Sequence, residues 1–387
     1  MNLKFWNSKL IGWTYRHVQR WVYRHDAEVE RQYRYDDCVA KFRERLLKNN
    51  IPVDKPAPGE DEYIRFWQQF DKRVEPYTYR FFSRIVGPNP HIVPEDVADA
   101  YIERVLNPRQ YRNLYNDKNF FAKIIPDKDV WPQTLLCRID GGTILNAQFA
   151  GVTNGDVATI LKPYDKVVLK PSKDSHSGQG VRLLQREGNK LKDKDGRWVD
   201  VGYLLSYGDN FVVQEVIQQH PYLEQFCQTS CNTMRVMTYR SVKDESVSIF
   251  GAVLRIGHEG SFVDNLFAGG GFATIDVETG KLGKCVYDEF GRKYNDINGI
   301  DFSSIQYQIP FWREVCVFAK SIGQRIPHCR LIAMDITYDF QNKPRLIEFN
   351  IGSLNWSLVM YAGKINFGDK FDEVIDYCLK NKKEIYK

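Results

Sequence analysis

Hydrophobic residues in the first fifty positions of the chain recur with the period of a helix. Trp6, Leu10, Trp13, His17 and Trp21 follow one another at steps of three or four, so one face of the predicted helix carries three indole rings. Five lysines and arginines precede the first acidic residue. A cationic helix with tryptophans on its apolar side can rest on anionic lipid or on a partner. Packing against the protein's own body is the commoner outcome and is the one we expect.

Breaks in this pattern divide the rest of the amino-terminal region. The segment 51–59 holds three prolines and a glycine, which form a linker or stop a helix. A second helical block is predicted over 60–84, and Pro94, Glu95 and Asp96 open a further helix with acids in its first turn. From about residue 130, β-branched runs separated by glycine turns predict strands. The pattern therefore predicts an α+β body behind a helical amino-terminal region.

The composition narrows the class of protein. A chain of 387 residues that is 43% hydrophobic can bury two or three cores, which excludes wholesale disorder. The net charge of +5 comes from 54 basic and 49 acidic residues, a balance that argues against a dedicated nucleic-acid binder. The chain has no long apolar run and no signal-peptide pattern, so we expect a cytoplasmic protein. The eight scattered cysteines predict reduced structural thiols.

The sharpest chemical signal is the segment 331–350, LIAMDITYDFQNKPRLIEFN. Two apolar strands flank a predicted turn over 339–344, and a symmetric turn pairs Asp335 with Glu348. Asn350 shares a strand face with Glu348 because the two are two residues apart. Two carboxylates about 5 Å apart repel by roughly 3 kcal/mol at an effective dielectric of about 20, and a bound cation removes that cost. Oxygen ligands favour magnesium held together with nucleotide phosphates; the alternative is a solvated sheet face.

A second signal is the loop that follows the strand ending in Lys170. Gly178 and Gly180 close a stretch of small residues and permit backbone conformations that aim N–H groups at a phosphate, with Lys170 supplying positive charge. The loop is neither a Walker A motif nor a dinucleotide fingerprint. Taken alone, a Gly-Ser turn beside a lysine is more often only a turn.

Two arginines interrupt apolar strands farther along the chain. Arg235 lies in NTMRVMTY and Arg255 in AVLRIG. A buried guanidinium needs an anionic partner and suits bidentate contact with phosphate or carboxylate, although an internal ion pair would also satisfy it. Asn265 precedes three consecutive glycines, 269–271, which let a backbone approach a ligand closely.

The order of these motifs along the chain resembles that of the ATP-grasp enzymes. The similarity is greatest to the sugar-transfer-associated branch, whose members accompany glycosyltransferases in bacterial surface-polysaccharide synthesis. It covers about residues 110–360 and is carried by QEVIQQHP, SCNTMRVMTY, SFVDN and IEFN. The resemblance implies an ATP-grasp fold, in which two α+β lobes clamp ATP and Mg²⁺. We expect a helical, basic and aromatic region over 1–110, a first ATP-grasp part with the lid lobe over 111–213, and a carboxy-terminal lobe over 214–387.

The resemblance also implies residue roles. The acid that the family places after the adenine hinge for the ribose is replaced here by Gln218, Gln219 and His220, so Glu224 or a glutamine must serve. The expected ATP contacts are Lys118, Lys170, Ser177, Gly178, Gly180, Gln214, Glu215, Val216, Ile217 and Glu224; the expected magnesium ligands are Asp335, Glu348 and Asn350; and Arg235, Arg255 and Asn265 are expected to face the transferring phosphate and the acceptor.

The activity that the resemblance implies is ADP-forming ligation. Phosphoryl transfer from ATP to a carboxylate gives an acyl phosphate, which an amine or hydroxyl attacks. We expect an amino acid or similar group to be attached to a sugar acid or glycan precursor, whether a small molecule or a sugar-linked one, with no nucleic-acid partner. The alternatives are a kinase on the same scaffold, and a nucleotide-binding scaffold that docks on glycosyltransferases. Residues 1–25 could make a peripheral contact with such enzymes or with the inner face of the membrane.

Overall fold

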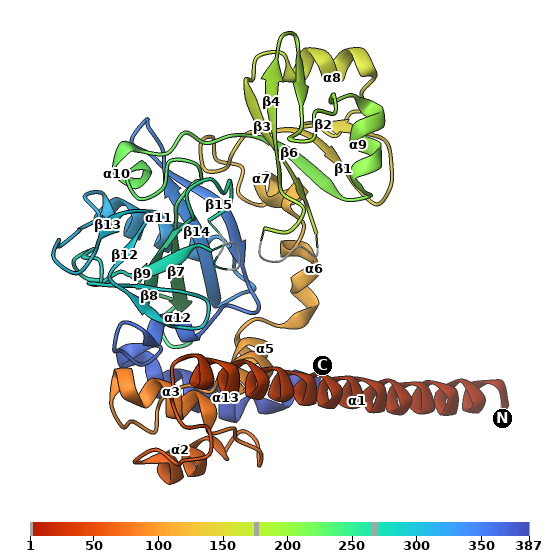
Figure 1. Cartoon of the computed structure of the whole chain (residues 1–387). Coiled ribbons are helices and arrows are strands. Elements are labelled where there is room, and N and C mark those ends of the chain that lie inside the picture. The colour runs from red at the N-terminus through yellow and green to blue at the C-terminus, as the bar shows by residue number, and fades with distance from the viewer. Residues whose placement is uncertain (1–2, 174–177, 265, 267–268, 387) are drawn as a thin grey trace.

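The computed structural model of the chain describes residues 3–173, 178–264, 266 and 269–386. Figure 1 shows two sheet-containing lobes and a layer of helices built from amino-terminal and carboxy-terminal segments of the chain. Helices and antiparallel sheets are segregated rather than alternating, so the fold class is α+β, as predicted. No helix within the described ranges is long and apolar enough to cross a bilayer.

The amino-terminal region is helical, as its periodicity predicts. Helix α1 spans Leu3–Lys48 and stops before the proline-rich segment 51–59. The block expected over 60–84 is instead two helices, α2 (Glu60–Trp67) and α3 (Tyr77–Val86). Pro76 has no N–H to continue a helix, and the Glu75 carboxylate accepts hydrogen bonds from the first N–H groups of α3, at 2.7 Å from Tyr77 and 3.0 Å from Thr78. Short turns follow: α4 (Glu95–Val97), the π-helical η1 (Ala98–Ile102), α5 (Glu103–Leu106), η2 (Arg109–Tyr111), α6 (Arg112–Tyr115), η3 (Lys118–Phe120) and α7 (Phe121–Ile124).

The carboxyl end of the chain returns to these helices. Helix α13 (Phe371–Lys380) buries Phe371, Val374 and Cys378 in the same core as Trp67 and Phe82. The helical layer is therefore built from segments near both ends of the chain. The expected division into 1–110, 111–213 and 214–387 assigns the helical region to 1–110 alone. The remaining elements of this end are α12 (Ser357–Met360), η5 (Gly368–Lys370) and η6 (Lys382–Tyr386).

The first lobe is built on a sheet of six described strands in the order β2-β1-β6-β3-β4-β5. Every neighbouring pair is antiparallel. Its core contains Leu136, Val167, Leu184 and Phe211. The elements are β1 (Thr134–Arg138), β2 (Leu145–Asn146), α8 (Asn154–Leu161), β3 (Lys166–Pro171), β4 (Arg182–Glu187), β5 (Lys190–Lys192), α9 (Val201–Tyr207) and β6 (Phe211–Glu215), and the expected boundary at 213/214 falls inside β6.

The second lobe contains an antiparallel sheet of seven described strands in the order β11-β10-β9-β8-β7-β14-β15. One face packs on helix α11 (Trp312–Gln324), and the other packs partly on the helical layer. The remaining elements of the lobe are α10 (Pro221–Glu224), β7 (Thr233–Arg240), β8 (Val247–Ile256), β9 (Gly271–Thr274), β10 (Val286–Tyr287), β11 (Lys293–Tyr294), β12 (Asp296–Ile297), β13 (Ile300–Asp301), β14 (Leu331–Tyr338) and β15 (Pro344–Asn350).

The hairpin of β14 and β15 has the predicted register at the site but not the predicted turn. Tyr338 pairs with Pro344, so the turn is one residue shorter than expected. A bulge between Asp335 and Ile336 takes up the difference and restores the pair of Asp335 with Glu348. All eight cysteines lie in the described part of the chain and are free thiols, as expected.

Candidate active site

The strand register of the second lobe gathers the predicted site residues into one row. Glu348 pairs with Asp335 across the hairpin, Asp335 pairs with Arg235 of β7, and Arg235 pairs with Val253 of β8. Directly opposed residues of an antiparallel sheet share a face. Arg255 lies two residues beyond Val253 and so points to this same face.

Asp335 is neutralised by two arginines. The Arg235 guanidinium donates two parallel hydrogen bonds of 2.8 Å to the two carboxylate oxygens, and Arg255 Nη1 donates a third of 3.2 Å. Burial alone would raise the pKa of Asp335, but Arg235 and Arg255 hold it below its ordinary value. The two guanidinium groups therefore offset the negative charge of Asp335, in addition to the bound cation that the sequence predicts for the carboxylate pair.

Glu348 and Asn350 are better placed to receive a ligand. The Glu348 side chain is 29% exposed, and its carboxylate lies 3.6 Å from the Lys118 ammonium. Among the described residues, the buried Asn350 Nδ2 has no hydrogen-bond partner. Asp335 keeps unused lone pairs beside its three donors, since a carboxylate has about four acceptor positions. This all-oxygen donor set fits Mg²⁺ bound together with phosphates.

Two lysines of the first lobe face these carboxylates. Burial, and then the nearby Lys118, lower the pKa of Lys170 to about 8, with Glu348 and Asp335 acting in the opposite direction. The backbone fixes the pair, because Lys118 N donates to Ser172 O at 3.0 Å and ties η3 to the end of β3. Cations on one lobe and carboxylates on the other form the charge pattern that a magnesium-bound triphosphate complements.

The glycines of the predicted lid loop have the conformations expected of them. Gly178 and Gly180 have φ of 68° and 78°, in the left-handed region that favours glycine. A Cβ on Gly180 would lie 2.9 Å from Pro171 Cγ, and one on Gly178 would lie 3.4 Å from Val263 Cγ1. The carboxyl end of this loop therefore reaches the second lobe. Two predicted residues, Ser177 and Asn265, lie outside the described residues.

The predicted adenine hinge lies where β6 leaves the first sheet. The Glu215 carboxylate accepts hydrogen bonds from Gln133 N at 3.0 Å and from Arg345 of β15 at 2.9 Å, and so links the two lobes. Gln214 is buried, and its Oε1 has no partner in the described part of the chain. Val216 and Ile217 follow directly, and Glu224 ends α10.

Gln219 is not available as a ribose contact. Its Nε2 donates to Cys227 O at 2.9 Å and to Ser230 O at 2.8 Å, and its Oε1 accepts from Asn232 N at 2.9 Å. The side chain is buried and holds the loop before β7. Of the residues proposed for the ribose, Gln219 is thus a structural one, and Glu224 keeps that assignment as a prediction.

The sequence did not single out Asp264 or Cys231. Asp264 lies 3.1 Å from Arg255, accepts a hydrogen bond from Thr233 Oγ1, and has a raised pKa because it is buried. Burial raises the pKa of the Cys231 thiol to about 12, against the influence of Lys170. Asp264 belongs to the SFVDN segment that carries part of the resemblance. Its contact with Arg255 could not be foreseen, because the sequence does not fix how the strands are aligned with one another.

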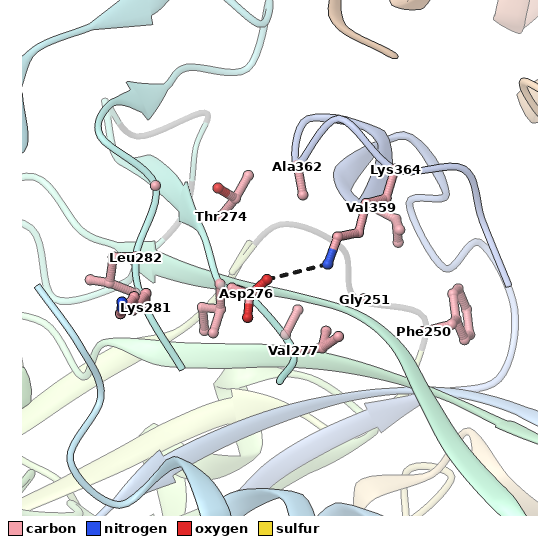
Figure 2. Close-up of a pocket in the computed structure, with 13 residues that line it drawn as sticks. Phe250, Gly251, Thr274, Asp276, Val277, Lys281, Leu282, Val359, Ala362 and Lys364 are labelled. Atoms are coloured by element: carbon pink, nitrogen blue, oxygen red, sulfur yellow. Dashed lines mark hydrogen bonds and ion pairs between the residues drawn. The ribbon is translucent and has the colours of Figure 1, made fainter. Parts of the chain in front are cut away.

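A small cavity lies on the same face of the sheet, two strands from Arg235. Its volume is about 150 Å³, and its walls include Gly251, Thr274 and Val359. Figure 2 shows the Lys364 ammonium pointing at the Asp276 carboxylate across this space, at 3.2 Å. Ligand pockets usually span about 300–1,000 Å³. The cavity suits a group of a few atoms and is too small for a nucleotide.

Lysines and carboxylates thus face each other, with arginines beside them, which is an arrangement that suits phosphoryl transfer from a nucleotide. The chain belongs to the sugar-transfer associated ATP-grasp family, whose model matches residues 97–363. Its fold is accordingly the ATP-grasp fold, and its cofactors are ATP and Mg²⁺. A comparison with curated proteins finds no match.

Several solved ATP-grasp enzymes share features of the fold. The D-alanine–D-alanine ligase of Bacillus anthracis is 11% identical, with a TM-score of 0.35, over 69% of this chain and 68% of that one. The ATP-grasp ligase PsnB, complexed with precursor peptide PsnA2 and AMPPNP, is 13% identical, with a TM-score of 0.39, over 84% and 76%. The ADP complex of the N5-carboxyaminoimidazole ribonucleotide synthetase purK is 11% identical, with a TM-score of 0.36; this chain matches it over 62% of its own length and spans only 45% of that enzyme. With TM-scores below 0.5, these similarities add nothing to the family match.

Proposed function

We propose that this protein is an ATP-dependent, ADP-forming ligase that activates a carboxylate as an acyl phosphate and passes the acyl group to an amine or hydroxyl. The observation that carries the proposal is the row Glu348, Asp335, Arg235 with Arg255 beside it, opposite Lys118 and Lys170. Phosphoryl transfer depends on positioning and on neutralising the charge that develops on the phosphate, and this row supplies both.

Each side of the site then has its own task. Lys118 and Lys170 hold the phosphates of ATP, and Glu348, Asn350 and Asp335 hold magnesium, which neutralises charge on those phosphates. Arg235 and Arg255 exchange part of their contact with Asp335 for the transferring phosphate and the acceptor carboxylate, since guanidinium binds both groups in a bidentate fashion. Because the family is described as sugar-transfer associated, we propose that the carboxylate belongs to a sugar acid or glycan precursor and is joined to an amino acid or a similar amine.

Trapping with hydroxylamine tests this function. The protein is incubated with ATP, Mg²⁺, hydroxylamine and a panel of sugar acids and amino acids, and hydroxamate and ADP are measured. A carboxylate-dependent hydroxamate is expected, because hydroxylamine attacks an acyl phosphate. A stable phosphorylated product without hydroxamate would instead establish the kinase. ADP release that no carboxylate or amine increases would favour the nucleotide-binding scaffold.

A further inference from the structure

The amino-terminal half of α1 stands apart from the protein's body. Figure 1 shows this end of the helix extending past the helical layer. Between residues 13 and 25, every side chain that the structure describes is exposed or half-buried, and Ala27 is the first buried residue among the described side chains of the helix. The expectation that the tryptophan face packs on the protein is therefore wrong for this stretch: Trp13 is 54% exposed and Trp21 is 66% exposed.

Aromatic and apolar side chains gather on this free stretch. Trp13, Val18, Trp21 and Val22 are all exposed; Val18, Trp21 and Val22 are neighbours on the helix surface, and Trp13 lies about two turns before Trp21. The Trp13 ring lies tilted against His17, and the Trp21 ring stacks on His25, each one turn away, so these rings contact their own helix. Large exposed apolar surfaces of this kind mark sites of interaction with a protein or a membrane.

The charges of this stretch are all positive. Residues 1–25 contain Lys4, Lys9, Arg16, Arg20 and Arg24 and no acid. The three arginines follow one another at four-residue steps, a like-charge row that destabilises an isolated helix in water. The first turn of α1 also has no acid to offset the positive end of the helix dipole. A negatively charged surface offsets all of these charges together.

We propose that residues 1–25 form an interfacial helix that binds the surface of an anionic lipid bilayer. Tryptophan prefers the boundary between headgroups and acyl chains, and cations beside it are attracted to anionic lipid. This surface lies outside the ATP site, so it adds a location to the proposed function without depending on it.

A second copy of the chain is a poorer occupant of the same face. Acids that could pair with these cations in an antiparallel dimer follow on the same helix, and the nearest glutamates among them already have ion-pair partners within the chain. Glu30 pairs with Arg104 and, at 2.9 Å, with Arg109, and Glu28 pairs with Arg31. In a parallel dimer the arginine rows of the two helices would repel each other.

The test is vesicle flotation of the full-length protein. Vesicles of phosphatidylcholine alone are compared with vesicles containing 30% phosphatidylglycerol. We expect binding to the anionic vesicles only, and loss of that binding in high salt. Replacing Arg16, Arg20 and Arg24 by glutamine should weaken binding roughly a hundred-fold, since each cation near an anionic surface contributes about a five-fold factor.

Matched variants separate this proposal from general effects of charge or folding. Replacing the exposed Lys162, Lys190 and Lys194 of the first lobe by glutamine makes the same change in net charge and should leave flotation unchanged. The melting temperature of the arginine variant should equal that of the wild type, because the described side chains of residues 13–25 are exposed or half-buried. Equal loss in both triple variants, binding to neutral vesicles, or self-association that Trp13→Ser and Trp21→Ser abolish would each overturn the proposal.

Discussion

Asp335 is the residue on which the electrostatic balance of the site depends. Its carboxylate is held by Arg235 and Arg255, and Arg255 is shared with Asp264 at 3.1 Å. A buried guanidinium without an anionic partner is costly. An arginine that is released from Asp335 would therefore require another anion. Under the proposed function, an incoming phosphate takes over part of the contact of these arginines with Asp335.

Glu348→Gln should abolish turnover and leave the fold intact. The change removes a negative oxygen from the magnesium site and also relieves the repulsion between Glu348 and Asp335. We expect kcat to fall on the order of 10²–10³-fold, the effect of losing one group that stabilises transition-state charge. Steady-state ADP release at saturating Mg²⁺ measures this change. The exposed Glu278→Gln is the control, and near-normal turnover in Glu348→Gln would remove Glu348 from the metal site.

Lys170→Met should stabilise the nucleotide-free protein and weaken ATP binding. The pKa of Lys170 falls from 10.5 to about 8 on folding because the ammonium is buried, with Lys118 close to it. Between pH 8 and 10.5 the unfolded chain therefore holds a proton that the folded chain has lost, so the contribution of this group to stability rises with pH through that window. At pH 7 the charged ammonium opposes folding.

Thermal melting at pH 7 and at pH 10 checks this prediction, together with ATP titration by calorimetry. We expect the variant to melt a few degrees higher than the wild type at pH 7, with a smaller difference at pH 10, and to bind ATP at least about ten-fold more weakly. Lys166→Met, an exposed change on the same strand, is the control. A variant that melts lower at pH 7 with unchanged ATP affinity would contradict the account.

Asp96→Asn should stabilise the protein at neutral pH. Cys38, Glu75 and Asp96 are buried together, with ligand atoms within 4.8 Å of one another, and within the described residues Asp96 Oδ1 has no hydrogen-bond partner. Burial, and then the neighbouring Glu75, raise the pKa of Asp96 well above its ordinary value. A raised acid pKa makes stability fall as pH rises above the ordinary value, and an asparagine has no such dependence.

Denaturant unfolding from pH 4 to pH 8 measures this effect. The gain at pH 8 should be about 1–3 kcal/mol, the cost of leaving a buried polar group unsatisfied, and it should shrink towards pH 4. The exposed Asp54→Asn should show neither change. A destabilised Asp96→Asn variant, or one stoichiometric metal ion in the purified protein that this variant lacks, would make the cluster a metal site instead.

The helical layer supports the strands that carry the proposed magnesium ligands. Asn107 is buried between β14 and the residue after Asn350: its Nδ2 donates to Leu331 O at 2.7 Å and to Ile351 O at 2.8 Å, and its Oδ1 accepts from Leu331 N at 2.9 Å. Glu103 accepts hydrogen bonds from Ser353 N and Leu354 N, both at 2.9 Å. The turns after α1 therefore hold the end of β15 in place.

Asn107→Ala should destabilise the protein and disturb the magnesium site. We expect a loss of about 2–4 kcal/mol in the free energy of unfolding, because buried backbone groups of Leu331 and Ile351 lose their partners. The Mg²⁺ concentration for half-maximal activity should rise, since Ile351 follows Asn350 directly. Asn189→Ala, at an exposed turn, is the control. Normal stability and normal Mg²⁺ dependence would show that the helical layer does not position the ligand.

The sequence predicted elements better than it predicted their contacts. Two apolar runs and the turn residues between them located the hairpin. The predicted pair of Asp335 with Glu348 was correct, although the turn is one residue shorter than expected and a bulge compensates. The contacts of Asp335 with Arg235 and Arg255 could not be predicted in this way. They join β14 to strands 80–100 residues earlier in the chain, and the pattern within one strand does not fix its register against another.

The same limit explains the misjudged helix. Periodicity identified α1 and its tryptophan face correctly, but periodicity reports a face and not what covers it. The carboxyl half of α1 is fixed by ion pairs such as Lys41 with Glu95 at 2.7 Å and Arg34 with Asp99 at 3.3 Å. These partners lie more than fifty residues away in the sequence.

The whole molecule combines three parts with different tasks. In the proposed site, the first lobe supplies lysines and the predicted lid loop, and the second lobe supplies carboxylates and arginines. The helical layer supports the second lobe with segments from near both ends of the chain. Glu215 and Arg345, 2.9 Å apart, link the two lobes at the hinge. Because the site is divided between the lobes, its geometry depends on how they close around a nucleotide.

A crystal structure with Mg²⁺ and a non-hydrolysable ATP analogue tests the central claim most directly. The account predicts phosphates between Lys118 and Lys170, magnesium on Glu348 and Asn350, adenine against the backbone of 215–217, and at least one of the two arginines released from Asp335 towards the terminal phosphate. A nucleotide bound elsewhere, or magnesium that contacts neither Glu348 nor Asn350, would contradict the account.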